Sequence, residues 1–472
     1  MGKQAGLTRR SFVAGAGGAA LAFPMVNFGY YTLSAASSRK YSGRAMDIVG
    51  EALVIDMLAP LHMDFSPDAN TKPPSEQAIA DYKASGITGF HNSFGLGGPD
   101  AYTDTLRYFA NWQGYAGRSP DVFALIGTMD ELEHAKATGR IGVIMGVQNA
   151  DHFRSVEDVK TFYDLGQRCS QLTYNSQNLL GSGSTERVDG GVSDYGVEIM
   201  KAMSEVGMLI DVSHSGDQTT LDAVKLSPVP IAFTHSNCRA ISGHVRSKTD
   251  EAIKALGDKG GVMGIAGVRQ FVRKTDPTNI THIADHIDHV VKLTAIEHVG
   301  IGSDSDLYGY DDMKPEQNKM LRSAYKGSYA FRDKIDVDGF DHPLKMFDLT
   351  EELLRRNYSA QNIKAVLGQS SACASAALSR VSRRHYGTWL CKDRLRSARL
   401  GLRPVRWRIF LLAGCGQHRP SGDDARRSEG GRCALAGHRG CQSRRGFAGK
   451  LDRGSGRGAG CRFEHRQRSA RA

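Results

Sequence analysis

Two histidines and one aspartate each follow a short apolar stretch, where their side chains could carry out chemistry. His214 lies in LIDVSHSG, His235 lies in AFTHSN, and Asp304 lies in GIGSDSD. Imidazole and carboxylate groups are the ligands that zinc and similar divalent ions accept, and a catalytic site leaves one coordination position open for water. Asp304 can equally serve as a general base that takes a proton from water. These residues predict a metal or catalytic site.

Two further polar positions follow apolar stretches in the same way. Gln148 comes directly after GVIMGV, and Tyr174 with Asn175 ends SQLTYN. An amide oxygen can ligate a metal, and a phenol can donate a hydrogen bond. Gln148 is therefore a candidate ligand, and Tyr174 is a candidate for contact with a substrate.

The elements that must position these residues repeat one theme along the middle of the chain. Short runs rich in Val and Ile alternate with amphipathic segments such as 156–166 and 195–207, which predict helices. Continuous apolar strands that alternate with helices indicate a parallel sheet covered on both faces. Eight such units predict a (β/α)8 barrel, in which the strands' C-terminal ends carry the chemistry. The predicted strands are 52–56, 86–90, 142–147, 170–174, 207–212, 230–234, 261–267 and 298–304.

Four segments carry a resemblance to a known family. IDVSHSG, PIAFTHSN, HVRSKTDEAIKAL and HVGIGSDSD, with QLTYNSQNLLGSG at 171–183, resemble in order and spacing the membrane (renal) dipeptidase family of zinc metallopeptidases. The resemblance runs from about residue 50 to about residue 368. It implies a (β/α)8 barrel, two zinc ions bridged by a glutamate and a hydroxide, and hydrolysis of the amide bond of a dipeptide.

The resemblance also implies roles for individual residues. His214 and His235 match the histidines of the second zinc site, Asp304 matches the catalytic aspartate, and Arg246 matches the arginine that holds the carboxylate of the substrate. A guanidinium can grip a carboxylate with two parallel hydrogen bonds. Tyr174 stands where the family has a histidine that faces the substrate.

Other positions depart from the family pattern. Gln148 occupies the place of the bridging glutamate, and a neutral amide is a poor bridge between two dications. The His-x-Asp of the family falls at residues 58–60, which read Leu-Ala-Pro. His62 and Asp64 do form His-x-Asp, but four residues later, so they can bind metal only if the loop shifts. One zinc ion is therefore expected rather than two.

Two functions stay open on these residues. The first is hydrolysis of dipeptides by water that a metal activates, with a small dipeptide-like molecule as the substrate. The second is a catalytically impaired barrel that binds a small ligand or partner without cleaving it.

The start of the chain predicts export. Residues 7–23 read LTRRSFVAGAGGAALAF, in which paired arginines precede a short Gly/Ala-rich stretch, the order of a twin-arginine signal. This pattern predicts a periplasmic protein. It predicts a membrane-associated one if the signal is not cleaved, because an uncleaved signal would act as an anchor. We assign residues 1–40 to the signal segment and 41–380 to the barrel.

The last part of the chain has a different composition. The formal net charge is +11, yet residues 381–472 alone carry about +17, so the rest of the chain carries about −6. Six of the eight cysteines lie beyond residue 370, without metal-type spacing. Three interpretations stay open for this tail: a disordered basic segment, an exported disulfide module, or translation in a wrong reading frame. Export and the lack of interleaved aromatic residues argue against nucleic acid as a partner.

Overall fold

The computed structural model describes residues 30–31, 39–66 and 69–370. The predicted twin-arginine motif and the Arg/Gly/Cys-rich tail lie outside the described residues. Among the described residues, no helix is both long and apolar enough to cross a bilayer.

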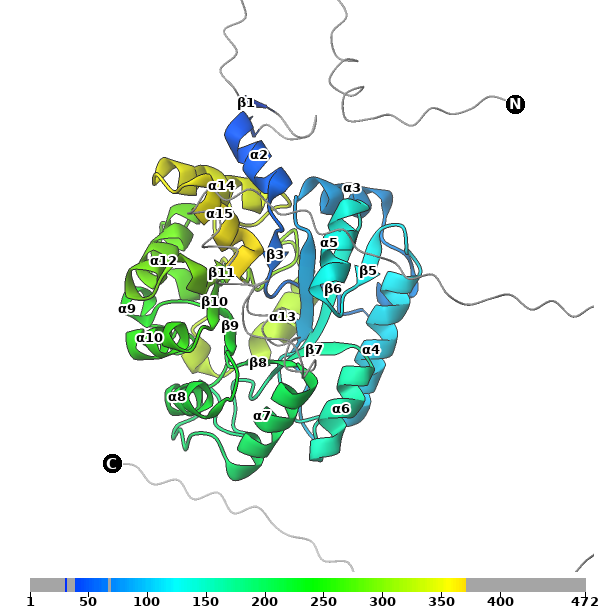
Figure 1. Ribbon diagram of the computed structural model, residues 1–472, viewed down its shortest axis with the longest axis vertical. Helices are drawn as coiled ribbons and strands as arrows, with labels where there is room; N and C mark the ends of the chain where they lie inside the picture. The colour runs from blue at the N-terminus through cyan, green and yellow to red at the C-terminus, as the bar shows by residue number, and fades with distance from the viewer. Residues whose placement is uncertain (1–29, 32–38, 67–68, 371–472) are drawn as a thin grey trace, which may run out of the picture. The chain divides into compact units, whose positions relative to one another are not determined.

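Eight parallel strands form a closed barrel at the centre of the molecule (Figure 1). The strands pair in the order β4, β3, β11, β10, β9, β8, β7, β6, and the pairing of β6 with β4 closes the ring. This arrangement confirms the predicted (β/α)8 fold. The barrel strands are β3 (Ile55–Asp56), β4 (Gly89–Phe94), β6 (Ile141–Val147), β7 (Gln167–Gln171), β8 (Leu209–Asp211), β9 (Ala232–Ser236), β10 (Val262–Ile265) and β11 (Val299–Ile301).

All eight predicted strands correspond to barrel strands, but some of their bounds differ. β4 continues to Phe94 through polar residues, and β7 begins at Gln167 and ends at Gln171. Tyr174 therefore lies in the loop after β7 rather than at its end. A short additional strand, β5 (Phe123–Leu125), pairs with the start of β6 and was not predicted. The described chain also holds a two-stranded pairing of β1 (Tyr30–Tyr31) with β2 (Tyr41–Ser42).

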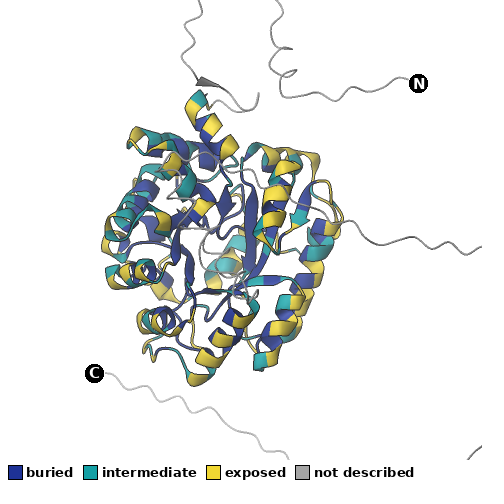
Figure 2. Ribbon diagram, viewed as in Figure 1, coloured by how far each residue is buried: buried dark blue, intermediate teal, exposed yellow. Residues whose placement is uncertain are grey.

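Helices surround the barrel, with their buried sides toward the strands and their exposed sides outward (Figure 2). Side-chain caps fix the start of several of them: Thr249 accepts from Ala252 N in α10, and Ser193 accepts from Gly196 N in α7. The helices are α2 (Gly43–Glu51), α3 (Glu76–Ala84), α4 (Ala101–Gly117), α5 (Met129–Ala137), α6 (Val156–Asp164), α7 (Asp194–Val206), α8 (Asp217–Leu226), α9 (Arg239–Ser242), α10 (Asp250–Asp258), α11 (Arg269–Val272), α12 (Ile280–Leu293), α13 (Pro315–Ser323), α14 (Lys345–Arg355) and α15 (Ala360–Lys364). Short helical turns are η1 (Ala69–Thr71), η2 (Ile296–His298), η3 (Gly327–Tyr329) and η4 (Ala365–Gln369).

A long connection follows β11. Residues 302–344, here called the mouth segment, include α13 and η3 and lead to α14. Tyr329 and Ile335 of this segment pack with Val268 and Phe271, which follow β10, in a small apolar cluster of their own. The mouth segment is therefore packed against the loop that follows β10.

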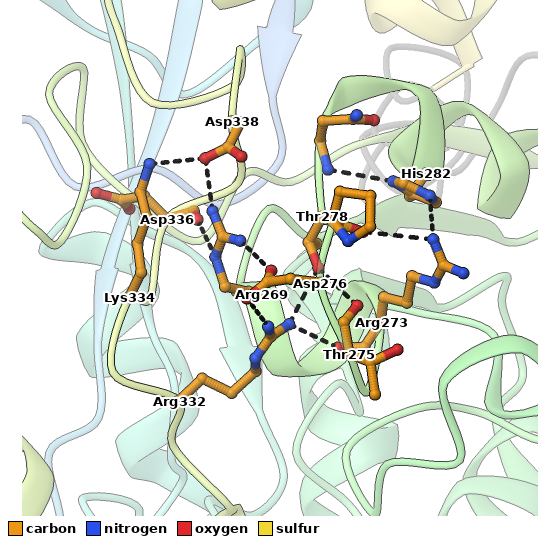
Figure 3. Close-up of polar contacts among 12 residues, drawn as sticks. Arg269, Arg273, Thr275, Asp276, Thr278, His282, Arg332, Lys334, Asp336 and Asp338 are labelled. Atoms are coloured by element: carbon orange, nitrogen blue, oxygen red, sulfur yellow. Dashed lines mark hydrogen bonds and ion pairs between the residues drawn. The ribbon is translucent and has the colours of Figure 1, made fainter.

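An ionic network fixes the mouth segment to the same loop (Figure 3). The buried Arg269 donates to the carbonyl of Asp336 at 2.6 Å, and it pairs with Asp276 at 2.5 Å and with Asp338 at 2.6 Å. Arg332 also pairs with Asp276. One arginine thus joins residues that are about sixty positions apart in the chain.

Candidate active site

The two histidines come together at the mouth of the barrel. His214 lies in the turn after β8, His235 lies within β9, and their Nε2 atoms are 2.9 Å apart. Both side chains are buried. The sequence predicted this convergence, because the C-terminal ends of neighbouring parallel strands share one end of the barrel.

A hydrogen-bond chain sets the tautomer of His235. The Thr234 hydroxyl is 2.6 Å from Asp211 Oδ2 and 2.8 Å from His235 Nδ1. That hydroxyl has one proton, and a carboxylate must accept it, so Thr234 Oγ1 accepts the proton on Nδ1 of His235. The lone pair of His235 is therefore on Nε2.

The loop after β7 sets the tautomer of His214, which is the same as that of His235. Asn175 Oδ1 lies 2.8 Å from His214 Nδ1 and also accepts from Ser184 Oγ at 3.4 Å. Nδ1 of His214 therefore donates, and its lone pair is also on Nε2. Burial, and next the charge of Arg246, lower the pKa of both histidines well below the usual value. Two neutral imidazoles thus point their lone pairs at one spot, which suits a cation.

Asp304 stands at the same mouth after β11. Its backbone has φ 60°, and its N–H donates to Leu58 O at 2.8 Å. This left-handed conformation is one that Asp and Asn tolerate better than most residues. Burial raises the pKa of Asp304 to about 7, with a smaller opposing effect from Arg246. Its carboxyl group can therefore both accept and release a proton near neutral pH.

One cavity of about 720 Å³ joins most of the predicted site residues. His214, Asp304, Gln148 and Tyr174 all line it. The ring of Tyr174 stacks on that of His214, with centroids 4.0 Å apart and planes inclined by 19°. Gln148 Nε2 donates to Ser93 O at 2.9 Å, so its amide is anchored to β4.

Two buried basic side chains lie behind the histidines. The guanidinium of Arg246 donates to Ser213 O and, at 3.3 Å, to His235 O, and its Nε has no hydrogen-bond partner among the described residues. Lys248 Nζ donates to Val212 O, Ser215 O and Thr220 Oγ1 at 2.7 to 2.9 Å. These contacts hold the turn that carries His214.

The loop after β3 separates its two predicted ligands: Asp64 lines the rim of the same cavity, whereas His62 is not among the lining residues. His62 Nε2 is 2.7 Å from Asn70 Oδ1, and the His62 ring packs on Trp112 with centroids 4.7 Å apart. Asp64 accepts from Ser66, Gln317 and Lys314 at the rim. Leu58 and Pro60 are buried. His62 and Asp64 therefore make contacts that do not involve His214 or His235.

Sequence reasoning missed several polar groups inside the barrel. Asp56 is buried at the end of β3, where its Oδ1 accepts from Ser303 N at 2.7 Å, and Lys345 Nζ lies 3.9 Å from its Oδ2. His91 on β4 is buried, and its Nε2 has no hydrogen-bond partner among the described residues. The only signal for either was a polar residue at the end of a predicted strand: Asp56 is the last residue of 52–56, and His91 directly follows 86–90.

The donor set at the mouth contains two nitrogen ligands and lacks the carboxylates of the family pattern. His214 and His235 supply two neutral nitrogens, but no group of three His, Cys, Asp or Glu residues in the described part of the chain could hold a metal. Gln148 brings no charge, and the positions at Leu58 and Pro60 bring no donor. A second ion would lack the carboxylates that such a site needs.

The fold is thus a closed (β/α)8 barrel, and its C-terminal mouth carries two convergent histidines. The sequence matches the family described as Membrane dipeptidase (Peptidase family M19) over residues 68–315, more than half of the chain. The chain therefore belongs to the membrane dipeptidase family, as its motifs indicated.

Individual relatives agree with this assignment. Dipeptidase verJ of Clonostachys rogersoniana is 31% identical over 254 residues, which cover 53% of this chain and 59% of that protein. An uncharacterized dipeptidase of Schizosaccharomyces pombe is 32% identical over 184 residues, or 38% of this chain and 44% of the relative. The chain thus spans about half the length of the curated relatives it matches. The crystal structure of an amidohydrolase from Pseudomonas aeruginosa superposes with a TM-score of 0.62 at 25% identity, covering 71% of this chain and 98% of that one.

Proposed function

We propose that this protein hydrolyses the amide bond of a dipeptide or a related small amide, with one divalent ion, zinc, bound by Nε2 of His214 and Nε2 of His235. The observation that carries the proposal is the meeting of two imidazole Nε2 atoms at 2.9 Å, where His214 lines the cavity that Asp304 also lines and His235 lies buried directly behind it. A zinc ion bound there supplies Lewis acidity toward the amide carbonyl and makes water more acidic.

Asp304 is the proton carrier in this proposal. Because its pKa is raised to about 7, its carboxylate can take a proton from the attacking water and pass it to the departing amine.

In this proposal Tyr174 contacts the substrate, and Arg246 acts on it through its charge from behind the histidines. The Tyr174 hydroxyl lies 2.6 Å from that of Tyr325, and burial raises the pKa of Tyr174, so the phenol stays protonated and can donate to a substrate oxygen. Arg246 lends positive charge to the inner end of the cavity, which favours the substrate carboxylate there.

A second candidate function is binding without hydrolysis. The specific observation in its favour is the replacement of metal ligands by Gln148 and Leu58, with the amide of Gln148 already engaged by Ser93 O. A barrel of this kind would hold a dipeptide-like ligand in the same cavity and release it intact.

Metal analysis combined with a dipeptide turnover assay separates the two functions. Hydrolysis predicts about one equivalent of zinc and turnover that His214→Ala abolishes, while His134→Ala, a change at an exposed histidine, leaves both unchanged. Binding of dipeptides with neither bound metal nor turnover would support the second function and reject the first.

The cellular location of the protein is part of the same proposal. Export through the twin-arginine route would deliver the folded barrel to the periplasm, either free or anchored by its signal, where small peptides are available. Cell fractionation of the full chain and of an Arg9→Lys, Arg10→Lys variant tests it: retention of the variant in the cytoplasm is expected, and identical distribution would reject it.

A further inference from the structure

The cavity extends well beyond the two histidines. Its inner end is formed by His214, Asp304 and Tyr174, and other lining residues come from α4 and from the loop after β3. A volume of about 720 Å³ is typical of pockets for molecules larger than the smallest dipeptides. The cavity therefore has room for a large group on the substrate.

Besides several tyrosines, three aromatic side chains that pack on one another line this cavity, and we call them the aromatic wall: Phe65, Phe94 and Trp112. Phe94 and Trp112 are stacked with centroids 5.7 Å apart, and Phe65 meets Phe94 edge-on at 5.8 Å. Phe94 ends β4, directly beside Gln148, whose N–H donates to Phe94 O at 2.8 Å. The wall thus begins next to the candidate active site.

The loop after β3 builds this wall. It supplies Phe65, and it supplies His62, whose ring packs on Trp112 and on Tyr115 with centroid distances of 4.7 and 5.3 Å. The hydrogen bond of His62 Nε2 to Asn70 fixes the imidazole. His62 is therefore a positioning residue for Trp112.

Among the described residues, the charged side chains that line this end of the cavity, Asp64 and Arg118, are already engaged. Asp64 interacts with Lys314 at 3.4 Å and with Gln317 at 2.9 Å, and Arg118 donates to Asn70 O. The wall consequently offers apolar and aromatic surface, which favours an aromatic group by area and by ring contacts.

We propose that the aromatic wall is a specificity subsite for a large apolar, preferentially aromatic, side chain of a dipeptide-like substrate. In this protein, the loop that carries His62 and Asp64 serves that side chain rather than a metal ion. The proposal rests on the proposed function for the reaction at the amide bond, but the binding preference itself does not require turnover.

The first experiment measures specificity by turnover. The ratio of kcat/KM for Phe-Ala or Ala-Phe to that for Ala-Ala is expected to be about 10- to 100-fold in the native protein. It should fall toward one in Trp112→Ala and in Phe94→Ala. Phe65→Ala is a second variant, because Phe65 is 42% exposed and its loss leaves the core intact.

Two control variants and one variant of the positioning residue His62 complete the test. Trp112→Phe keeps a ring and should retain most of the preference, and Leu226→Ala, at a half-exposed position on α8, should retain all of it. His62→Ala should lower the ratio by raising KM for the aromatic dipeptides more than it lowers kcat. A ratio near one in the native protein, for both aromatic dipeptides, would overturn the proposal.

The second experiment measures binding without hydrolysis. Calorimetric titration of the Asp304→Asn protein with Ala-Phe, Phe-Ala and Ala-Ala should give tighter binding of an aromatic dipeptide by about tenfold or more. If an aromatic dipeptide binds preferentially but native protein cleaves nothing, the subsite stands and the proposed hydrolysis fails. If native protein cleaves dipeptides without preference, the hydrolysis stands and the subsite fails.

Discussion

At the scale of single residues, the site consists of groups whose environments set their protonation. His214 and His235 could be found from sequence because each ends an apolar run. Their tautomers could not, because Asn175, Thr234 and Asp211 act through contacts between strands that no local pattern contains. The contacts of Asp64 and the packing of His62 could not be predicted from sequence either, because they depend on residues that are distant in the chain.

Asp304→Asn should abolish turnover and stabilise the fold. A carboxyl group whose pKa is raised by burial binds a proton more tightly in the folded state, so stability falls as pH rises from about 4 to about 7. The Asp304→Asn variant has no ionisable carboxyl group at this position, so its stability does not fall in this pH range for that reason. Asparagine also tolerates the φ of 60° there. We expect a gain of about 1–3 kcal/mol near pH 8 in metal-free protein.

Denaturant titrations at pH 5 and pH 8 measure this change, since the gain should shrink at the lower pH. In the active native protein, kcat/KM should rise with pH through about 7 as Asp304 loses its proton. A rate that is flat from pH 5 to pH 9 would argue against a proton-carrying role.

Gln148→Glu should lower the stability of the metal-free protein and raise its affinity for zinc. The carboxylate would face Ser93 O, where the amide now donates at 2.9 Å, so the metal-free variant should melt at a lower temperature. With zinc, the added charge should tighten binding by about tenfold or more. Chelator competition and melting curves with and without zinc test both parts, with Gln148→Met as the uncharged control. Equal zinc affinity in all three proteins would contradict the expectation.

At the scale of elements, the strands could be predicted because buried parallel strands appear as apolar runs. β4 is longer than predicted because His91 to Ser93 are polar although buried, so a prediction from apolar runs ends before them. The mouth segment could not be predicted, because its position depends on Arg269 and on an apolar cluster assembled from distant residues.

Arg269→Met should loosen the mouth segment. The change removes three hydrogen bonds of a side chain that is 3% exposed, so the free energy of unfolding should fall by about 1–3 kcal/mol. Lys334→Ala removes ion pairs of an exposed lysine in the same network and should cost less than about 1 kcal/mol. Limited proteolysis should cut between residues 302 and 344 faster in the arginine variant only, and equal rates in both variants would contradict this role.

At the scale of the whole molecule, the barrel is closed by contacts between distant parts of the chain. Sequence periodicity predicts how many strands there are, but closure depends on β6 meeting β4 and on η4 packing against β3 and β11. Gly368 of η4 marks the second of these contacts: a Cβ placed there would lie 2.1 Å from Leu53 O and 2.7 Å from Ile55 N. The glycine lets the last described helical turn lie directly on the first barrel strand.

Gly368→Ala should therefore destabilise the whole barrel rather than one helix. Because the neighbouring atoms belong to the backbone, β3 or η4 must move, at a cost of about 1–3 kcal/mol or more. Gly50→Ala in α2 is the matched control, since nothing lies within 4 Å of its added Cβ and the helix should gain about 0.5–1 kcal/mol. Thermal unfolding should show opposite shifts for the two variants in a single transition each. Equal melting temperatures for the native protein and Gly368→Ala would mean that β3 does not depend on this contact to complete the barrel.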